Sequence, residues 1–298
     1  MKNMQPHIPV LRREVNKYLA PQKNQNFIDA TVGFGGHAKL ILEKTSPLGK
    51  LLAIDQDPVA IEEAQKNLKN YGNRITFINS NFDEIGLLVR KWPVPEIFGI
   101  LFDLGTSSYQ LSSERGFSFQ QNNPLDMRMS PNINLTAEKI INRWPAEKIR
   151  QIIWQYGEEP MARAITREIV ATRKARPIRT TGELVKVIEK AIHLRERTKR
   201  KMHFATLTFQ ALRIAVNDEL RALENGLKQA LQILSPGGRI VVISFHSLED
   251  RIVKQFFRGN PGLEILTPKP VAPSEKEIDD NPRARSAKLR AAIKKLNN

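Results

Sequence analysis

The stretch from residue 27 to residue 37, Phe-Ile-Asp-Ala-Thr-Val-Gly-Phe-Gly-Gly-His, places the strongest constraint on the fold. An apolar run typical of a buried strand ends at Asp29, and three glycines follow before the pattern becomes helical at His37. Glycine tolerates a positive φ and lets the backbone approach a ligand, and the helix after such a turn presents unpaired N–H groups. The stretch therefore predicts a strand, a ligand-binding turn and a helix.

The spacing of the turn indicates the kind of ligand. Gly33, Gly35 and Ala38 match the G-x-G-x-x-G/A pattern of dinucleotide-binding turns, and Asp55 follows the next apolar run at about the usual distance. A carboxylate in that place accepts hydrogen bonds from ribose hydroxyls, so we expect a ligand that carries a nucleoside. The pattern by itself does not separate NAD from S-adenosylmethionine.

Apolar runs alternate with helical patterns through the first hundred residues. After the first strand, such runs are found at residues 51–55, 75–79 and 97–103. This alternation predicts a parallel, doubly wound sheet, with the ligand beyond the carboxyl ends of its strands. Asp29, Asp55, Phe82 and Asp103 are therefore expected near one edge of the sheet.

The alternation stops after Leu104. Residues 105–134 are rich in Ser, Asn, Gly and Pro, and their interleaved Phe and Met indicate an ordered loop that forms a wall of the site. Residues 136–193 then read as helices without a strand signal, which indicates a helical domain inserted into the α/β domain. A long helical stretch at 206–234 and a buried strand at 239–244 resume the sheet domain.

These patterns predict three segments. Residues 1–110 form the first part of the sheet domain, residues 111–205 form an inserted loop and helical domain for substrate recognition, and residues 206–298 complete the sheet domain with a basic tail. Within the last part, the runs at 263–266 and 287–293 predict a hairpin at the edge of the sheet.

The charge of the chain is strongly basic and unevenly distributed. The formal net charge is +16; residues 138–203 carry 17 basic and 8 acidic residues, and residues 281–298 carry 6 basic residues and no acidic one. Such concentration indicates a polyanionic partner, first of all a nucleic acid, because each neutralised phosphate releases counterions. A solvated surface is the alternative, although such surfaces usually mix both signs more evenly.

Composition excludes several other classes. A chain of 298 residues with 41% hydrophobic content can bury a sizeable core. It has no run of about 18 apolar residues and no apolar leader at its N-terminus, so we expect a cytoplasmic protein without a membrane segment. The absence of cysteine excludes disulfides and thiolate chemistry, and the five histidines are too dispersed to indicate a metal site.

Several longer motifs resemble a single family. They are Gly35-Gly36-His37, Leu52-Ala53-Ile54-Asp55-Gln56-Asp57-Pro58, Asp103-Leu104-Gly105, Arg115-Gly116-Phe117-Ser118-Phe119, Pro124-Leu125-Asp126-Met127-Arg128-Met129, Phe209-Gln210-Ala211-Leu212-Arg213-Ile214, Ser244-Phe245-His246-Ser247-Leu248-Glu249-Asp250-Arg251 and Asn281-Pro282-Arg283-Ala284-Arg285-Ser286. Together they resemble the bacterial ribosomal RNA small subunit methyltransferase H family, also called RsmH or MraW. The resemblance extends from about His7 to Arg290.

The resemblance implies a class I S-adenosylmethionine-dependent methyltransferase, with a Rossmann-like, mostly parallel sheet and an inserted all-helical domain. It implies methyl transfer from S-adenosyl-L-methionine to the exocyclic N4 amine of a cytidine in the decoding region of 16S ribosomal RNA, within the small subunit. It implies no metal. Carried over by motif position, the cofactor contacts would be Gly35, Gly36, His37, Asp55, Phe82, Asp103 and Gln110.

In this scheme the glycine turn would receive the methionine end of the cofactor, Asp55 the ribose and Phe82 the adenine. Asp103 and Gln110 would lie beside the reacting end. The lone pair of a cytosine amine is delocalised into the ring, so a hydrogen-bond acceptor that draws the amine toward tetrahedral geometry would lower the barrier. Asp103 is the catalytic candidate, and His246 is a second candidate near the acceptor.

The RNA is expected to be held by basic residues on either side of the site. An accessible base requires RNA that is single-stranded or flipped at the target. The expected phosphate contacts are Arg195, Arg197, Lys199, Arg200, Lys201, Arg283 and Arg285.

Four residues depart from the family pattern. Thr106 and Tyr109 stand where we expect Val and Pro, and Phe204 and Leu207 stand where we expect Pro and Arg. The first pair lies in the loop that bears Gln110. The loss of a basic residue at Leu207 removes one contact that RNA could use.

Other functions remain open on the residues alone. An NAD(P)-dependent oxidoreductase would account for the glycine turn and Asp55, but not for the basic helices. A nucleic-acid-binding protein without activity would account for the charge, but not for the residues at the sheet edge. Among methyltransferases, DNA or another RNA remains possible, although the Pro-Pro-Tyr or Pro-Pro-Phe motif of DNA amino-methyltransferases is absent after Asp103.

Overall fold

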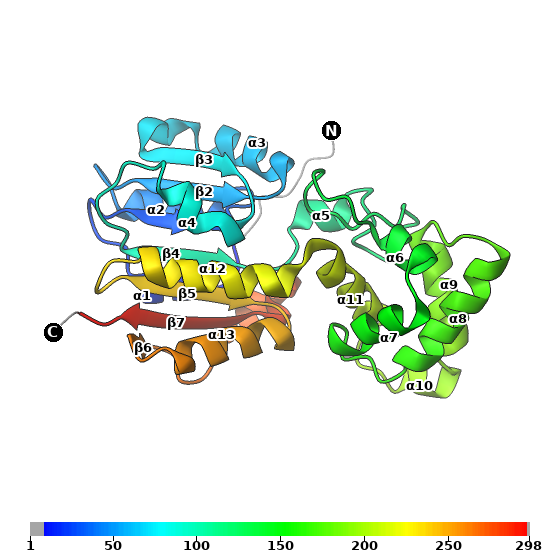
Figure 1. Cartoon of the computed structure of the whole chain (residues 1–298). Helices are drawn as coiled ribbons and strands as arrows, with labels where there is room; N and C mark the ends of the chain where they lie inside the picture. Colours follow the sequence, from blue (N-terminus) through cyan, green and yellow to red (C-terminus); the bar gives the residue numbers. More distant parts are fainter. Residues whose placement is uncertain (1–8, 297–298) are drawn as a thin grey trace. The chain divides into compact units, whose positions relative to one another are not determined.

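The computed structural model describes residues 9–296, so His7, where the family resemblance begins, lies outside the described residues. The chain forms two compact units (Figure 1). One consists of the residues up to Gly105 together with those from Leu220 onward, and it contains the sheet. The other consists of residues Thr106–Glu219 and is helical.

The sheet has seven strands in the order β3-β2-β1-β4-β5-β7-β6. Their bounds are β1 (Phe27–Asp29), β2 (Leu51–Asp55), β3 (Ile75–Asn79), β4 (Gly99–Asp103), β5 (Arg239–Ser244), β6 (Leu263–Ile265) and β7 (Lys288–Lys294). The first five strands are parallel, which confirms the doubly wound sheet. The order reverses between β1 and β4, where ligands bind in such sheets.

The predicted pairing of the last two strands is confirmed, but the hairpin is not simple. β7 is antiparallel to both β5 and β6, so it lies inside the sheet and β6 forms the edge. About twenty residues separate the two strands, and they include α14 (Glu275–Asp280) and the short 3-10 helix η3 (Pro282–Ser286).

The register brings three carboxylates onto one face of the sheet. Asp29 pairs with Ala53 of β2 and with Leu101 of β4. Asp55 and Asp103 each lie two residues farther along their strands. Because side chains alternate along a strand, residues two apart share a face. Asp29, Asp55 and Asp103 therefore lie on the same face at the carboxyl ends of their strands.

Helices bury both faces of the sheet. α1 (Arg12–Leu19), α2 (Gly36–Lys44) and α3 (Pro58–Asn67) share one apolar cluster with Leu51 and Leu101. α4 (Ile85–Val89), α12 (Glu219–Ile233) and α13 (Ser247–Gly259) share the other with Leu52 and Ile100. Each fully buried Leu or Ile contributes about 1.5–3 kcal/mol of transfer free energy. Two further 3-10 helices, η1 (Lys69–Arg74) and η2 (Phe82–Glu84), adjoin β3.

The helical unit has its own apolar core. Its helices are α5 (Ser108–Ser112), α6 (Ala137–Arg143), α7 (Ala146–Gln155), α8 (Ala162–Ala175), α9 (Thr181–Ala191), α10 (Leu194–Thr198) and α11 (Thr206–Asn217). The loop between α5 and α6 is ordered as predicted, because Phe117, Leu125 and Met127 are buried in this core. The Met127 N–H also donates to the Arg115 carbonyl at 2.7 Å.

The long helical stretch predicted over 206–234 is confirmed, but it is divided into two helices. α11 ends at Asn217, and Asp218 adopts a left-handed conformation with φ of 51° before α12 begins at Glu219. α11 packs with the helical unit through Phe209, Leu212 and Val216. For this reason the units divide at 105/106 and 219/220, whereas the sequence placed the boundaries at 110/111 and 205/206.

Membrane insertion finds no support in the helices of the structure. Among residues 9–296, no helix combines the length and the apolar character that crossing a bilayer requires.

Candidate functional site

The glycine turn after β1 has the open geometry that a bound ligand needs. Gly33 has a φ of +50°, and a Cβ placed on it would meet no atom within 4 Å. Gly35 has a φ of +91°, and a Cβ there would lie 2.7 Å from Leu68 Cδ1. Gly35 is thus required for packing, whereas the space beside Gly33 is free of protein. α2 begins at Gly36, directly after the turn.

Asp55 fastens this turn to the end of β2. Its Oδ2 accepts a hydrogen bond from the Gly33 N–H at 2.9 Å, and its Oδ1 accepts one from the Asp57 N–H at 2.9 Å. Asp57 in turn caps α3, since its side chain accepts from the Val59 N–H.

Asp103 and His37 meet beside the turn. Asp103 Oδ2 lies 3.7 Å from His37 Nε2, and the Asp103 N–H donates to Thr31 Oγ1 at 2.6 Å. The other carboxylate oxygen, Asp103 Oδ1, is buried without a hydrogen-bond partner among the described residues. Burial, followed by the nearby charges of Asp29 and Glu249, raises the pKa of Asp103 well above its ordinary value.

Asp29 also belongs to this group, although it is predicted from the sequence only to lie near the sheet edge and not to bind a ligand. Its side chain is 1% exposed, and its Oδ1 accepts from the Thr31 N–H at 3.3 Å. Burial is the main cause that raises the pKa of Asp29 to about 7, and the charge of Asp55 adds to it. The sequence contains a signal for such a buried carboxyl, because Asp29 ends an apolar run just before the glycine turn.

Phe82 lies in η2, three residues after the end of β3, so it is close to the same edge. Its ring contacts Phe102 edge-on with a centroid distance of 5.5 Å. A Cβ on Gly226 of α12 would lie 2.8 Å from the same ring. Phe82 therefore packs against the sheet with one part of its ring, and it is half-buried.

Gln110 belongs to the helical unit, where it has a structural role. Its Oε1 accepts from the Ser107 N–H at 3.0 Å, while Ser107 Oγ accepts from the Gln110 N–H at 3.2 Å. This reciprocal pair is a capping box at the start of α5. The other predicted cofactor residues lie in the sheet unit.

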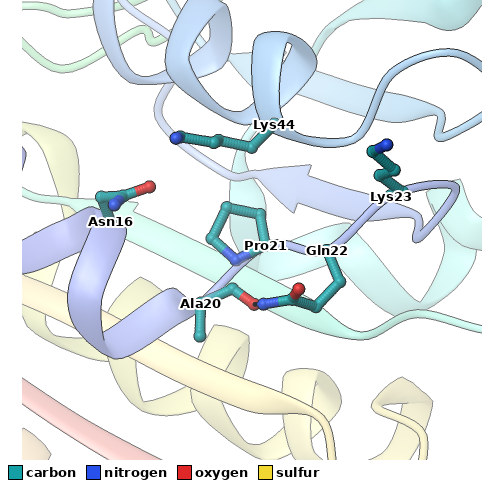
Figure 2. Close-up of a pocket in the computed structure, with 6 residues that line it drawn as sticks. All are labelled: Asn16, Ala20, Pro21, Gln22, Lys23 and Lys44. Carbon is teal, nitrogen blue, oxygen red and sulfur yellow. Dashed lines mark hydrogen bonds between the residues drawn. The ribbon is translucent and has the colours of Figure 1, made fainter.

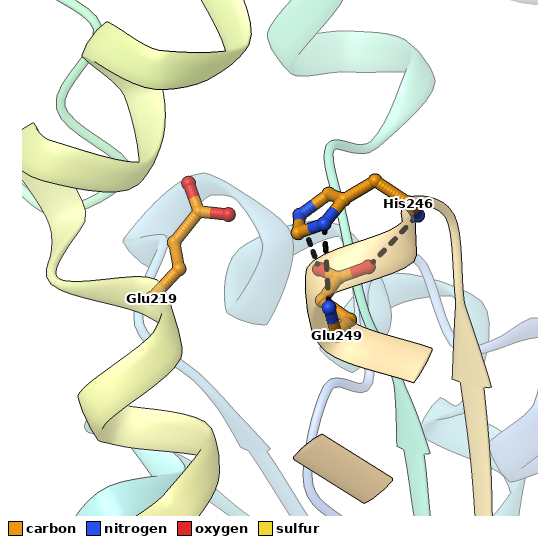
Figure 3. A group of neighbouring side chains, drawn as sticks. All are labelled: Glu219, His246 and Glu249. Atoms are coloured by element: carbon orange, nitrogen blue, oxygen red, sulfur yellow. Dashed lines mark hydrogen bonds and ion pairs between the residues drawn. The ribbon is translucent and has the colours of Figure 1, made fainter. Parts of the chain in front are cut away.

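His246, the second catalytic candidate, caps α13. Its Nε2 lies 3.2 Å from Glu249 Oε1, and its Nδ1 accepts from the Glu249 N–H at 3.4 Å (Figure 3). Glu249 Oε2 accepts from the His246 N–H at 3.3 Å, which completes a capping box, and also from the Phe245 N–H at 2.8 Å. The sequence motif includes Glu249 but predicts no role for it, although a His-x-x-Glu spacing after a strand indicates a helix cap.

Most of the basic residues predicted to hold RNA in the helical unit are already paired with acids. Arg200 forms two hydrogen bonds of 2.7 Å to Glu159, whose side chain is fully buried. Arg197 pairs with Glu189, and Lys199 pairs with Glu196.

Other predicted RNA contacts have no such pairing. Within residues 9–296, Arg195 and Lys201 form no ion pair. Arg283 and Arg285 lie in η3 of the sheet unit and are exposed.

A cavity of about 350 Å³ lies at the opposite edge of the sheet (Figure 2). It is lined by Asn16, Ala20, Pro21, Gln22, Lys23 and Lys44. These residues precede β1 and β2 in the chain, so the cavity is at the amino ends of the strands. None of the residues predicted to bind cofactor or RNA lines it.

The fold and the edge residues define a class of protein. A sheet in the order 3-2-1-4-5-7-6, with β7 antiparallel, a glycine turn after β1 and carboxylates at the ends of β1, β2 and β4, is that of a class I S-adenosylmethionine-dependent methyltransferase. The chain belongs to the MraW methylase family, whose model matches residues 4–295. This membership confirms the resemblance and excludes the oxidoreductase.

Proteins named ribosomal RNA small subunit methyltransferase H are among its relatives. That of Thermomicrobium roseum is 47% identical over 305 residues, covering 96% of this chain and 93% of that protein. That of Thermotoga neapolitana is 49% identical over 289 residues, covering 96% and 95%. Among solved structures, an rRNA methylase from Streptococcus thermophilus is similar with 12% identity and a TM-score of 0.46, covering 97% of this chain and 99% of that one.

Proposed function

We propose that this protein transfers a methyl group from S-adenosyl-L-methionine to the exocyclic N4 amine of a cytidine in the decoding region of 16S ribosomal RNA. Its substrate is the RNA within the small ribosomal subunit, and it acts in the cytoplasm. Family membership and the names of the relatives support the small-subunit rRNA. The observation that carries the chemistry is Asp103 Oδ1, a buried carboxylate oxygen without a hydrogen-bond partner among the described residues, beside the glycine turn.

The edge of the sheet fits the cofactor. The free space beside Gly33 accommodates a ligand that approaches the backbone, and Asp55, which holds the turn at the end of β2, is a carboxylate of the kind that accepts hydrogen bonds from ribose hydroxyls. Phe82, at the end of β3, offers an apolar surface for adenine. When bound, the cofactor supplies a methyl group on a positively charged sulfur.

Asp103 is placed to act on the cytosine amine. The amine nitrogen must lose conjugation with the ring before its lone pair can form a bond to carbon. An acceptor that holds an N–H of the amine favours this geometry, and Asp103 Oδ1 has no competing partner among the described residues.

The same carboxylate can receive the proton that the product must lose. When the nitrogen gains a methyl group it becomes cationic, and one of its two original protons must leave to give the neutral methylamine. The raised pKa of Asp103 makes its carboxylate a stronger base than an ordinary aspartate. The other oxygen, Asp103 Oδ2, lies 3.7 Å from His37 Nε2.

The helical unit would recognise the RNA. Its Arg195 and Lys201, which are free of ion pairs within the described residues, and Arg283 and Arg285 of the sheet unit are the strongest phosphate contacts among the predicted set. Arg200 would contribute by holding the buried Glu159 in place.

The acceptor class is tested by offering three substrates with labelled S-adenosylmethionine: small subunits from cells that lack the protein, naked 16S RNA, and DNA. We expect incorporation into small subunits and none into DNA. Subunits from wild-type cells, already methylated, are the matched control and should accept no label. Label in DNA, or equal label in both subunit preparations, would contradict the proposed substrate.

A further inference from the structure

A second cavity of about 230 Å³ lies between α13 and the antiparallel end of the sheet. It is lined by Lys254, Phe257, Arg258, Ile265, Thr267, Pro268 and Arg290. Its three charged residues are all cationic. α13 begins at the carboxyl edge and runs back along the sheet, so Arg258, in its last turn, is remote from the glycine turn. The cavity is therefore separate from the site that contains Asp103.

Arg290 gives this cavity a rigid cationic group. Its side chain is 9% exposed, and it is held on Asp250 by hydrogen bonds of 2.6 Å from Nε and 3.1 Å from Nη2. No hydrogen bond from Nη1 is found among the described residues, which leaves its N–H groups for a ligand. A guanidinium remains charged at any physiological pH and suits the planar oxygens of a phosphate.

Two further cations border the cavity without acidic partners. Lys254 and Arg258 are four residues apart on α13, so they project from the same face of the helix. Neither forms an ion pair within residues 9–296. The acids of α13 are turned away from solvent, because Glu249 is buried in the helix cap and Asp250 is used by Arg290. The helix dipole favours a cation at Arg258, but it does not account for a hollow beside it.

The shape and lining indicate a nucleotide. The lining combines the three cations with apolar residues, of which Ile265 and Pro268 are accessible and Phe257 is buried. The volume is below the roughly 300–1,000 Å³ of sites for whole small ligands, so it suits one unit of a longer chain. A phosphate with its sugar and base combines a charged and an apolar part in that size, and bases pack well on apolar side chains.

We propose that this cavity binds one phosphate of the substrate RNA strand, together with the nucleoside attached to it, at a distance from the reacting base. The inference rests on the proposed function, since it takes the RNA substrate as the source of the nucleotide. It assigns Lys254, Arg258 and Arg290 to the phosphate and Ile265 and Pro268 to the nucleoside.

The test measures the affinity of the full-length protein for a 16S RNA fragment over a series of salt concentrations. The variant Lys254→Gln/Arg258→Gln removes two cations without touching the Arg290–Asp250 pair. For single-stranded RNA, each lost phosphate contact reduces the slope of log affinity against log salt by about 0.7, and the cavity holds one phosphate, so we expect a reduction of about 0.7. The melting temperature and S-adenosylmethionine affinity should remain those of the wild type.

The matched control is Lys23→Gln/Lys44→Gln, which removes two cations from the cavity at the amino ends of the strands (Figure 2). Its salt slope should equal that of the wild type. Equal slopes for all three proteins, or equal reductions in both variants, would overturn the proposal.

A titration with cytidine monophosphate separates the two sources of a nucleotide. Binding that is as tight as that of the RNA fragment, and that is lost in the Lys254→Gln/Arg258→Gln variant, would overturn the assignment to an RNA strand in favour of a free nucleotide. Failure of the proposed function is recognised separately, because the wild type would then bind RNA with the same salt slope but transfer no methyl group to it.

Discussion

The substitution Asp103→Asn separates catalysis from binding at the sheet edge. Asparagine has the same shape and keeps an oxygen that can accept a hydrogen bond, but its amide cannot take up a proton. The Asp103 N–H bond to Thr31 Oγ1 is made by the backbone and remains. Asp103 Oδ1 has no hydrogen bond to lose among the described residues, and the Oδ2 contact with His37 is long, at 3.7 Å. The fold should therefore tolerate the change.

The expected loss follows from the role of a base. A positioned base contributes about 10²–10⁴-fold to a rate, so kcat should decrease at least about a hundredfold. That corresponds to an increase of about 2.7 kcal/mol in the activation free energy. Because burial already penalises the charged form of Asp103, the neutral asparagine should leave the melting temperature unchanged or raise it.

The assay is single-turnover methyl transfer to small subunits, with cofactor affinity measured separately by calorimetry. The control Asp57→Asn removes another carboxylate near the same edge, where asparagine still caps α3, and it should retain its rate. Two results would refute the reasoning. One is a rate for Asp103→Asn within a few-fold of the wild type, and the other is a loss of cofactor affinity as large as the loss of rate.

Three further predictions concern the turn, the buried acid and the helical unit. Gly33→Ala places a side chain in free space at a φ of +50°, so it should cost about 1 kcal/mol of stability and weaken cofactor binding; calorimetry that finds unchanged affinity would contradict a ligand there. The pKa of Asp29 is about 7 in the folded protein against an ordinary 3.8, so between these values the folded state binds a proton that the unfolded state has lost. The free energy of unfolding should therefore decrease as the pH rises from about 4 to 7, by up to about 4 kcal/mol. Denaturant titrations of Asp29→Asn should lack this contribution to the pH dependence. Arg200→Ala leaves the buried Glu159 unpaired and should cost about 3–5 kcal/mol of stability in melting experiments, whereas Arg195→Ala should lower RNA affinity without that cost.

The sheet and its ligand edge could be predicted because they follow from local patterns. The apolar runs that end at Asp29, Asp55 and Asp103 become β1, β2 and β4, and the parallel register places the three carboxylates together. The spacing of the glycines predicts the turn, because glycine tolerates a positive φ. Gly33 and Gly35 both have a positive φ in the structure.

Contacts between distant parts of the chain could not be predicted in the same way. The sequence shows the charge of Arg200, which is the basis for predicting an RNA contact there. It does not show that Arg200 pairs with Glu159, which lies 41 residues away in the chain. α11 ends because the single residue Asp218 adopts a left-handed conformation. Aspartate tolerates this conformation, but an aspartate in the sequence does not predict it.

The central claim is the identity of the methylated atom. Small subunits from cells lacking the protein would be treated with the purified protein and isotopically labelled S-adenosylmethionine, and the 16S RNA digested to nucleosides for mass spectrometry. Our account predicts the label on the exocyclic nitrogen of cytidine from the decoding region. Label on a ring carbon, on the ribose, or on any other nucleoside would contradict it.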